Sequence, residues 1–272
     1  METNRQALYL FCLARPDLVG AIEGSGIDDG QALFVIPCAP DLCAIVCELP
    51  QEEFCGPAAE RRMRQLAWVA PRALRHEAVV EMVMRRSPVL PARFGTLFSS
   101  PERLAEFLAA HRKTISQFLG RVVDHEEWSV KGRLDRKRAT LALISERLAA
   151  QQAQLAALPP GTRYFQELRT RSAAEKELSL WLDEICRQVA SDLAKQACDV
   201  RECPVGSREA PESDAEVVLN WAYLLPHSGT SAFRARIDQL NVNHASQGLV
   251  WEMSGPWPPY RFVPSLSMGT SP

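Results

Sequence analysis

The sequence predicts an α+β fold of two domains, and three features support this class. Short β-rich runs precede helical periodicity near the N-terminus, a strand-like segment at 126–134 restarts the pattern, and two long amphipathic helices follow. With 272 residues, 46% of them hydrophobic and 24% charged, the chain has the length and composition of one large or two ordinary globular domains. We expect an N-terminal α+β domain over 1–122, related to the ferredoxin-like fold, and a C-terminal α+β domain over 123–272.

The N-terminal domain should begin with strands. Apolar runs at 7–14, 32–38 and 42–49 are β-rich, and Ala39-Pro40-Asp41 suits a turn between the last two. After Ala58 the apolar residues recur every three or four positions, which predicts a helix that Pro71 kinks or divides. These residues are Met63, Leu66, Ala67, Ala70, Leu74, Ala78 and Met82. A β-like stretch at 87–98 and a helix from Pro101, capped by Ser100, complete the domain.

The C-terminal domain should contain a helical hairpin over about 135–197. Its first strand, 126–134, alternates so that Trp128, Val130 and Gly132 share one face. Leucines then repeat every seven residues, a coiled-coil-like stripe that ends at the Pro-Pro-Gly turn after Leu158. The stripe comprises Leu134, Leu141, Leu148 and Leu155, with Ile144 and Leu158 in the intervening seam; a second helix, from about 162 to 197, carries Leu178, Leu182, Ile185, Val189 and Leu193 on one side. The two stripes either pack on each other or bind a partner helix.

Strands at 198–205, 216–226 and 248–255, with a helix at 230–245, follow the hairpin. The resulting order is β, helical hairpin, β, β, α, β. This is the split-βαβ order of a ferredoxin-like domain whose first crossover is enlarged.

Charge and cysteine usage exclude several classes of function. A formal charge of −2 and a pI near 6.2 do not favour nucleic acid or an anionic membrane as partner. No charged leader precedes an apolar run, and no stretch approaches the ~18 apolar residues of a membrane span, so we expect a cytoplasmic protein. Cys12, Cys38, Cys43 and Cys47 lie in apolar runs and should act as small hydrophobic residues. The cysteines lack the spacing of a zinc site, and neither metal nor cofactor is expected.

No catalytic constellation is evident. Phosphate-binding and nucleophile-elbow motifs are absent from the sequence. His76-Glu77 begins like a zinc-protease motif, but Val80 stands where the second histidine would be, so His76 should be structural. Arg93 lies between apolar neighbours and should pair with a carboxylate or face a partner. We therefore expect no enzyme; the rival hypothesis is a small-molecule enzyme whose pocket gathers Arg93, His76 and Glu81.

The closing segment 254–263 is rich in proline and aromatic residues. Gly255 should let the chain leave the last strand, and the prolines then hold an extended path. Trp257, Tyr260 and Phe262 can be pressed against the domain as a clasp over the core. The alternatives are an aromatic platform for a partner or a catalytic loop.

The sequence resembles the gas vesicle protein GvpF/GvpL family over nearly its whole length. The resemblance rests on segments in the family's order and spacing, of which "LPARFGT" (90–96) and "GPWPPY" (255–260) are the most specific; the others are "YLFCLA", "HEAVVEMVMRRSPVLPARFGTLF", "EEWSVKGRL", "PPGTRYFQELRTR" and "VVLNWAYLLP". Ala92 stands where relatives often carry Met, and Arg261 where Ser is common. Both F and L subtypes remain open.

The resemblance implies an accessory protein of gas vesicle assembly without catalysis. Such a protein would associate with the vesicle and bind the small hydrophobic shell subunit and other gas vesicle accessory proteins, limiting aggregation of the subunit during nucleation or acting as a scaffold. Candidate binding surfaces are the edge of the N-terminal sheet, which we prefer, the 90–98 segment and the hairpin; an architectural coiled-coil scaffold is the alternative. The residues of the two specific motifs are candidates for partner binding or structure: Leu90, Pro91, Arg93, Phe94, Gly95, Gly255, Pro256, Trp257, Pro258, Pro259 and Tyr260. The oligomeric state stays open.

Overall fold

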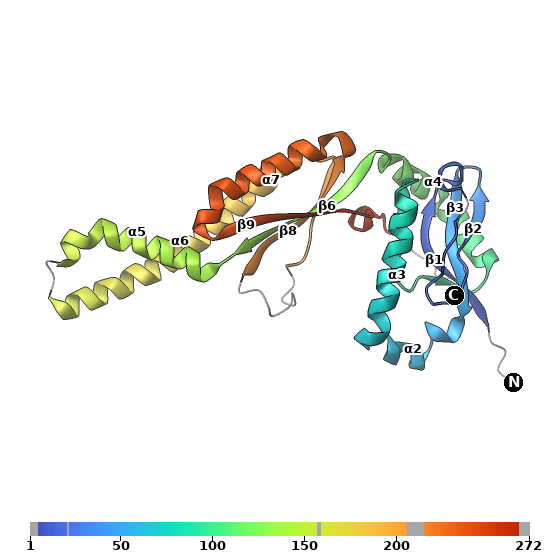
Figure 1. The fold of residues 1–272 in the computed structure, drawn as a ribbon, viewed down its shortest axis with the longest axis horizontal. Helices are drawn as coiled ribbons and strands as arrows, with labels where there is room; N and C mark the ends of the chain where they lie inside the picture. The colour runs from blue at the N-terminus through green and yellow to red at the C-terminus, as the bar shows by residue number, and fades with distance from the viewer. Residues whose placement is uncertain (1–4, 21, 157–158, 206–214, 267–272) are drawn as a thin grey trace. The chain divides into compact units, whose positions relative to one another are not determined.

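The computed structural model describes residues 5–20, 22–156, 159–205 and 215–266, without the side chains of 146–148, 150–155 and 167. The chain forms two compact units, which we treat separately (Figure 1). Unit 1 comprises Met1–Glu126 and Trp257–Pro272, and unit 2 comprises Glu127–Pro256. The closing segment was expected in the C-terminal domain, but its described part from Trp257 to Leu266 belongs to unit 1.

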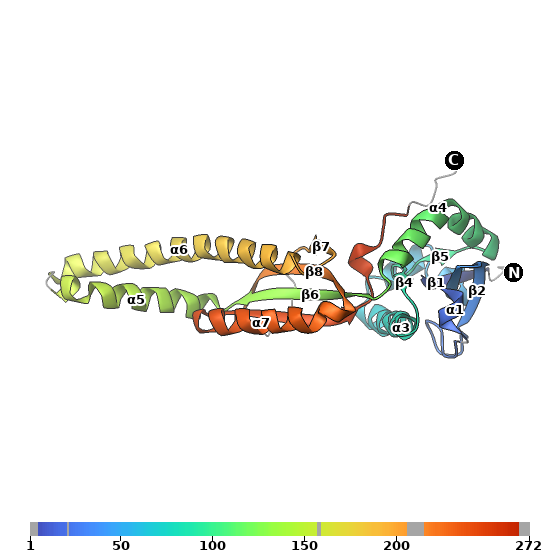
Figure 2. The same ribbon diagram turned by 90° about the horizontal axis from the view of Figure 1, so that it is seen from above.

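Unit 1 is an antiparallel sheet between two helices. Its sheet has the order β2-β3-β1-β4, and β5 also pairs with β1. Figures 1 and 2 show α3 and α4 on opposite faces of this sheet. The elements are β1 Gln6–Ala14, α1 Pro16–Val19, β2 Phe34–Ala39, β3 Leu42–Pro50, η1 Gln51–Glu53, α2 Pro57–Arg62, α3 Leu66–Met84, β4 Val89–Pro91, β5 Leu97–Phe98, α4 Pro101–Arg121 and the closing turn η4 Tyr260–Phe262.

The central strand β1 is buried on both faces. A shift in its pairing with β3 lies between Leu10 and Cys12. Tyr9 and Phe11 belong to the core under α3, and so do Cys12 and Ala14 beyond the shift. The shift is therefore a β-bulge, which changes which residues of the strand face α3.

The helical region after Ala58 is divided, but not where Pro71 predicted. α2 ends at Arg62 and α3 begins at Leu66, while Pro71 lies inside α3. The helix continues through Pro71 because the missing N–H leaves only the carbonyl of Ala67 without its donor, and Ala67 is exposed to water. The predicted cap of α4 is confirmed, since Ser100 Oγ accepts the N–H of Arg103 at 3.4 Å.

Unit 2 is a four-stranded sheet with the order β7-β8-β6-β9. One hydrophobic core joins this sheet to α6 and α7. Trp128, Val130 and Gly132 are all buried, as the alternation of β6 predicted, and a Cβ on Gly132 would lie 2.8 Å from the ring of Trp251. The elements are β6 His125–Leu134, α5 Arg136–Ala156, α6 Pro160–Ala194, β7 Asp199–Glu202, β8 Glu216–Pro226, η2 His227–Gly229, α7 Thr230–His244, η3 Ala245–Gln247 and β9 Leu249–Trp257.

α5 and α6 lie side by side as a helical hairpin (Figures 1 and 2). The predicted leucine stripe is wrong at two positions: Leu134 ends strand β6, and Leu141 is 62% exposed. α5 packs through Ala139 and Leu143 instead, so Leu141 points away from the core. The side chains of Leu148 and Leu155, and Leu158 itself, lie outside the described residues. None of the described helices is long and apolar enough to cross a membrane.

Candidate functional site

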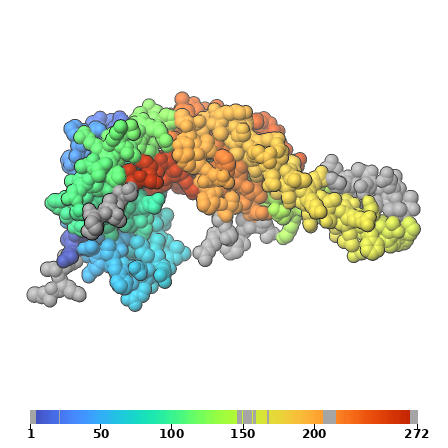
Figure 3. Space-filling model, turned by 180° about the vertical axis from the view of Figure 1, so that it is seen from behind, coloured from blue at the N-terminus to red at the C-terminus, as the bar shows by residue number. Residues whose placement is uncertain are grey.

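Helix α3 exposes an apolar face. Its inner face, with Val79, Val80 and Val83, is buried in the core of unit 1. On the opposite face Leu66 is 78% exposed and Leu74 72% exposed. We call this face the α3 stripe; it consists of Leu66, Ala67, Ala70, Pro71, Leu74 and Ala78, of which only Ala70 is partly buried. Figure 3 shows the light-blue and cyan surface of α2 and α3 at the lower edge of unit 1. Two leucines, three alanines and a proline on one exposed face of a helix form the kind of apolar surface that suits a partner.

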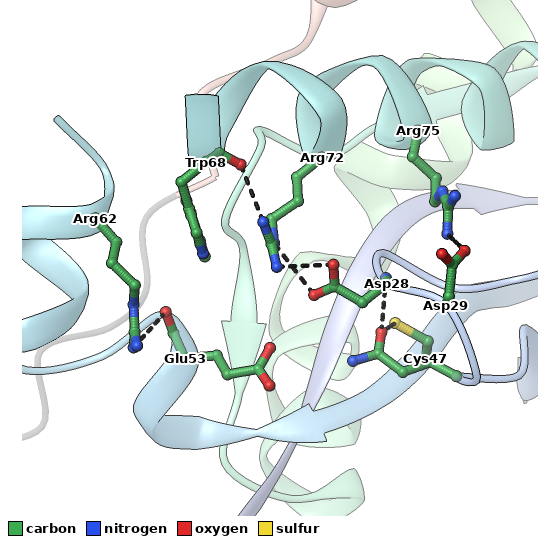
Figure 4. Close-up of polar contacts among 9 residues, drawn as sticks. Asp28, Asp29, Cys47, Glu53, Arg62, Trp68, Arg72 and Arg75 are labelled. Carbon is green, nitrogen blue, oxygen red and sulfur yellow. Dashed lines mark hydrogen bonds and ion pairs between the residues drawn. The ribbon is translucent and has the colours of Figure 1, made fainter. Parts of the chain in front are cut away.

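A cluster of polar contacts attaches the N-terminal half of α3 to the loop that carries Asp28 and Asp29 (Figure 4). Arg72 contacts Asp28 twice, through Nη2 at 2.8 Å and through Nε at 3.1 Å. The same guanidinium donates to the carbonyl of Trp68 at 3.1 Å and lies 4.2 Å from the centre of its ring. Because both carboxylate oxygens are engaged, Asp28 fixes the orientation of α3 as well as its position.

The loop that carries Asp28 is itself packed on β3. Gln31 Oε1 accepts the N–H of Asp28 at 3.1 Å and the thiol of Cys47 at 3.6 Å. A Cβ on Gly26 would lie 2.7 Å from Cβ of Cys47, so only glycine permits this approach. Burial raises the pKa of the Cys47 thiol to about 11, which keeps it neutral.

Two further arginines extend the cluster. Arg75 pairs with Asp29 at 2.7 Å, and Arg62 Nη2 donates to the carbonyl of Glu52 at 2.7 Å. Arg72 and Arg75 are thus both paired with the adjacent aspartates of the same loop. These pairs were not predicted from the sequence, although two adjacent aspartates and two arginines three residues apart on a helix were a readable signal.

The "LPARFGT" motif contacts the buried side of α3, where the carbonyl of Ala92 meets His76. Leu90 and Pro91 are buried in β4, Phe94 and Gly95 are partly buried, and Arg93 is exposed. The expected partner of Arg93 on the preceding helix is not found, because Arg93 makes no ion pair with any described residue. Gly95 has φ of +82°, a left-handed conformation that favours glycine.

His76 is buried in a chain of hydrogen bonds. Its Nε2 lies 3.1 Å from the carbonyl of Ala92, which can only accept, so Nε2 carries the proton. Nδ1 therefore accepts the hydroxyl proton of Tyr9 at 2.8 Å, and the Tyr9 oxygen accepts the N–H of Gly95 at 3.2 Å. Burial lowers the pKa of His76 to about 4.

The enzyme hypothesis placed a pocket at Arg93, His76 and Glu81, and the structure does not form that pocket. Both nitrogens of His76 are engaged by protein groups, Arg93 is exposed on the surface, and Glu81 lies 4.0 Å from Arg85. The three side chains proposed for a pocket do not converge. Within the described ranges, no three His, Cys, Asp or Glu side chains are grouped to hold a metal ion.

The closing segment reaches α3 from outside. β9 runs to Trp257, so Gly255 and Pro256 lie inside the last strand rather than after it. Pro258 and Pro259 are buried, and so is Phe262. Tyr260 is partly buried, whereas Trp257 is 39% exposed.

Tyr260 lies beside Glu77, the residue that follows His76 on α3. Burial, together with this neighbouring carboxylate, raises the pKa of Tyr260. Burial also raises the pKa of Glu77, and neither Tyr260 Oη nor Glu77 Oε1 has a hydrogen bond of good geometry. Consecutive residues of α3 therefore meet the two specific motifs, His76 the first and Glu77 the second.

The edge of the N-terminal sheet is less suited to strand addition than we expected. β2 is the edge strand on one side of the sheet and β4 on the other; Pro37 stands within β2, followed by a shift in the pairing with β3. Proline has no N–H to offer an added strand, and irregular pairing twists an edge away. On β2, therefore, only Phe34–Ile36 remains as a regular template for an added strand.

Comparisons with known proteins give one family. The model of "Gas vesicle synthesis protein GvpL/GvpF" matches residues 7–264. Gas vesicle protein L of Streptomyces sp. (strain CB03234) is 26% identical over 97% of this chain and 94% of its own length. Gas vesicle protein F of the same strain is 28% identical over 94% of this chain and 98% of its own.

Two solved structures share the fold. The crystal structure of GvpF from Anabaena sp. PCC7120 has a TM-score of 0.67 at 21% identity, covering 96% of this chain and 99% of that one. GvpF from Microcystis aeruginosa has a TM-score of 0.62 at 16% identity, covering 95% and 99%.

Proposed function

The chain belongs to the GvpL/GvpF family of gas vesicle synthesis proteins, and from this premise we propose that it is a cytoplasmic assembly factor that binds the shell subunit. It would also bind other gas vesicle proteins and would carry out no catalysis. Its task is to cover apolar surface of the subunit during nucleation, before the wall buries that surface. This removes from water the surface that would otherwise drive aggregation.

The exposed α3 stripe is the observation that carries this proposal. A protein that shields an apolar client needs apolar surface of its own, and the stripe supplies it in a rigid helix. Arg75, which borders the stripe, is already paired with Asp29, so a partner does not have to desolvate an unpaired arginine at this position. The stripe replaces the sheet edge as our preferred binding surface.

Light scattering of the shell subunit in the presence of the full-length chain tests this function. The variant Leu66→Glu/Leu74→Glu should lose the suppression of aggregation, because each substitution places a charge in the apolar contact. Val242→Glu is the matched control, since Val242 is equally exposed on a helix of unit 2. Equal suppression by both variants would exclude the stripe, and failure of the unaltered chain to suppress aggregation would exclude shielding itself.

The two specific motifs are assigned a supporting role. "LPARFG" reaches His76 and "GPWPPY" reaches Glu77, so we assign both to holding α3 in place. The platform role of Leu90, Pro91, Arg93, Phe94 and Gly95, and of Gly255–Tyr260, is the alternative. Exposed Trp257 and Arg93 are the residues that favour it.

A scaffold acting through the hairpin is the second candidate. Tyr164, Phe165 and Leu168 are exposed on α6. Arg169 and Arg171 next to them are exposed and make no ion pair with described residues. These side chains offer a partner helix both apolar and charged contacts. We also interpret unit 2 as a ferredoxin-like split βαβ whose first crossover is the hairpin, consistent with its sheet order.

A further inference from the structure

The α3 stripe contains a regular alternation of large and small side chains. Leu66, Ala70, Leu74 and Ala78 follow one another at intervals of four residues, which forms a ridge along one side of the helix. Both leucines project into solvent. Ala70 between them and Ala78 beyond Leu74 leave hollows in the ridge. A helix that packs here needs hollows opposite the leucines and large residues opposite the alanines.

A second copy of α3 meets this requirement. We propose that two copies of this chain associate through the α3 stripe, antiparallel, about a two-fold axis at the level of Arg72. In this register Leu66 faces Ala78 of the second copy, and Ala70 faces Leu74 of the second copy. Every leucine then meets an alanine, and the contact is isologous, as closed dimers require.

The charges around the stripe permit this contact. Arg72 and Arg75 on one flank are held by Asp28 and Asp29. On the other flank Glu77 turns to Tyr260, while Glu81 lies in line with the stripe, one turn beyond Ala78, and 4.0 Å from Arg85. Over the segment Leu66–Ala78, no charged side chain therefore has to be buried between the two helices, and antiparallel helix dipoles attract each other.

The contact is small, so the dimer is weak. Six residues on each side bury far less than the ~1,200 Å² of a stable interface. Weakness suits the proposed function, because a client with more apolar surface displaces the second copy. The self-contact would thus cover the stripe until the shell subunit arrives. This consequence rests on the proposed function, but the dimer itself does not.

Sedimentation of the full-length chain without any client tests the dimer. Ala70→Leu should weaken self-association by ~10-fold or more, because two leucines then collide. The double variant Ala70→Leu/Leu74→Ala moves the large residue but keeps each leucine opposite an alanine, so self-association should return. Ala70 is only partly buried and leucine is a good helix former, so circular dichroism should show all variants folded.

The outcomes distinguish the proposed antiparallel register from non-specific hydrophobic association. Non-specific contact would strengthen with Ala70→Leu, which adds apolar surface, and that result would overturn the proposal. A chain that stays monomeric from ~1 to ~500 µM would overturn it as well. Because no shell subunit is present, a negative result leaves the shielding function standing, and failed shielding leaves the dimer standing.

Discussion

The hydroxyl of Tyr9 lies 2.8 Å from Nδ1 of His76, inside the core between β1 and α3. This contact joins the first strand of the chain to a helix 67 positions later, and it continues to both Gly95 and Ala92. Each polar group in the chain of bonds has a partner, so the network orients α3 without an unsatisfied buried group.

Removing the hydroxyl of Tyr9 should destabilise the protein. Tyr9→Phe leaves His76 Nδ1 and the N–H of Gly95 without partners, which should lower the free energy of unfolding by about 1–3 kcal/mol. Urea denaturation measures the loss. Tyr164→Phe, at an exposed tyrosine, is the control and should change nothing measurable. Equal effects of the two substitutions would contradict the role of the network.

Stability should fall in mild acid because of His76. Burial lowers its folded pKa from 6.5 to about 4, so the folded state binds its proton later than the unfolded chain. The stabilisation that results from this difference in pKa is fully present above pH ~6.5 and is lost as the pH falls toward ~4. The total loss in the free energy of unfolding is about 3 kcal/mol. Unfolding free energies at pH 7, 5.5 and 4.5 should therefore fall more steeply for the unaltered chain than for His76→Gln. Parallel curves would show that other groups cause the acid sensitivity.

The pair of Asp28 and Arg72 should stabilise unit 1 more than an exposed ion pair does. Asp28→Ala leaves a partly buried guanidinium without its two contacts, and we expect a loss of about 1–3 kcal/mol. Asp41→Ala removes an exposed pair with Arg112 at 3.2 Å and should cost less than about 1 kcal/mol. Thermal or urea unfolding compares them. A larger loss from Asp41→Ala would reverse this ranking.

The closing segment should stabilise unit 1 although it follows unit 2 in sequence. Phe262 is 4% exposed, and Phe262→Ala should cost about 3 kcal/mol. Faster hydrogen exchange in α3 should accompany the loss. Phe165→Ala makes the same change at an exposed site and should stay within about 0.5 kcal/mol. Unchanged exchange in α3 would argue against a clasp.

The hairpin should tolerate a charge at Leu141 but not at Leu178. Leu141→Asp alters an exposed side chain and should leave the helical content and melting temperature nearly unchanged. Leu178→Asp buries a carboxylate in the core of unit 2 and should unfold it. If Leu141→Asp stays folded and loses a partner in pulldown, the scaffold hypothesis gains support; if it stays folded and keeps every partner, that hypothesis loses its surface at this position.

Local pattern was enough to predict most of the elements, but not the short helix α1 or the break between α2 and α3. The strand alternation at Trp128, Val130 and Gly132, the cap at Ser100 and the apolar side of α6 were all legible, because a strand repeats every two residues and a helix every 3.6. The family was legible as well, from the order of its motifs.

Hydrophobic periodicity predicts a helix, but it does not predict which face of that helix packs on the core. The repeat from Leu66 to Ala78 predicted a helix, yet the core took its opposite face, with Val79, Val80 and Val83. The seven-residue leucine repeat likewise ran from a strand into a helix, where Ala139 and Leu143 rather than Leu141 pack on the core.

By itself the sequence determined most of the helices and strands, their order, and the family. The tertiary structure alone decided that α3 exposes leucines, that Asp28 meets Arg72, and that the closing segment returns to unit 1. The physical reason is range: backbone preference and apolar spacing act between near neighbours, whereas burial depends on which distant element supplies the opposing surface.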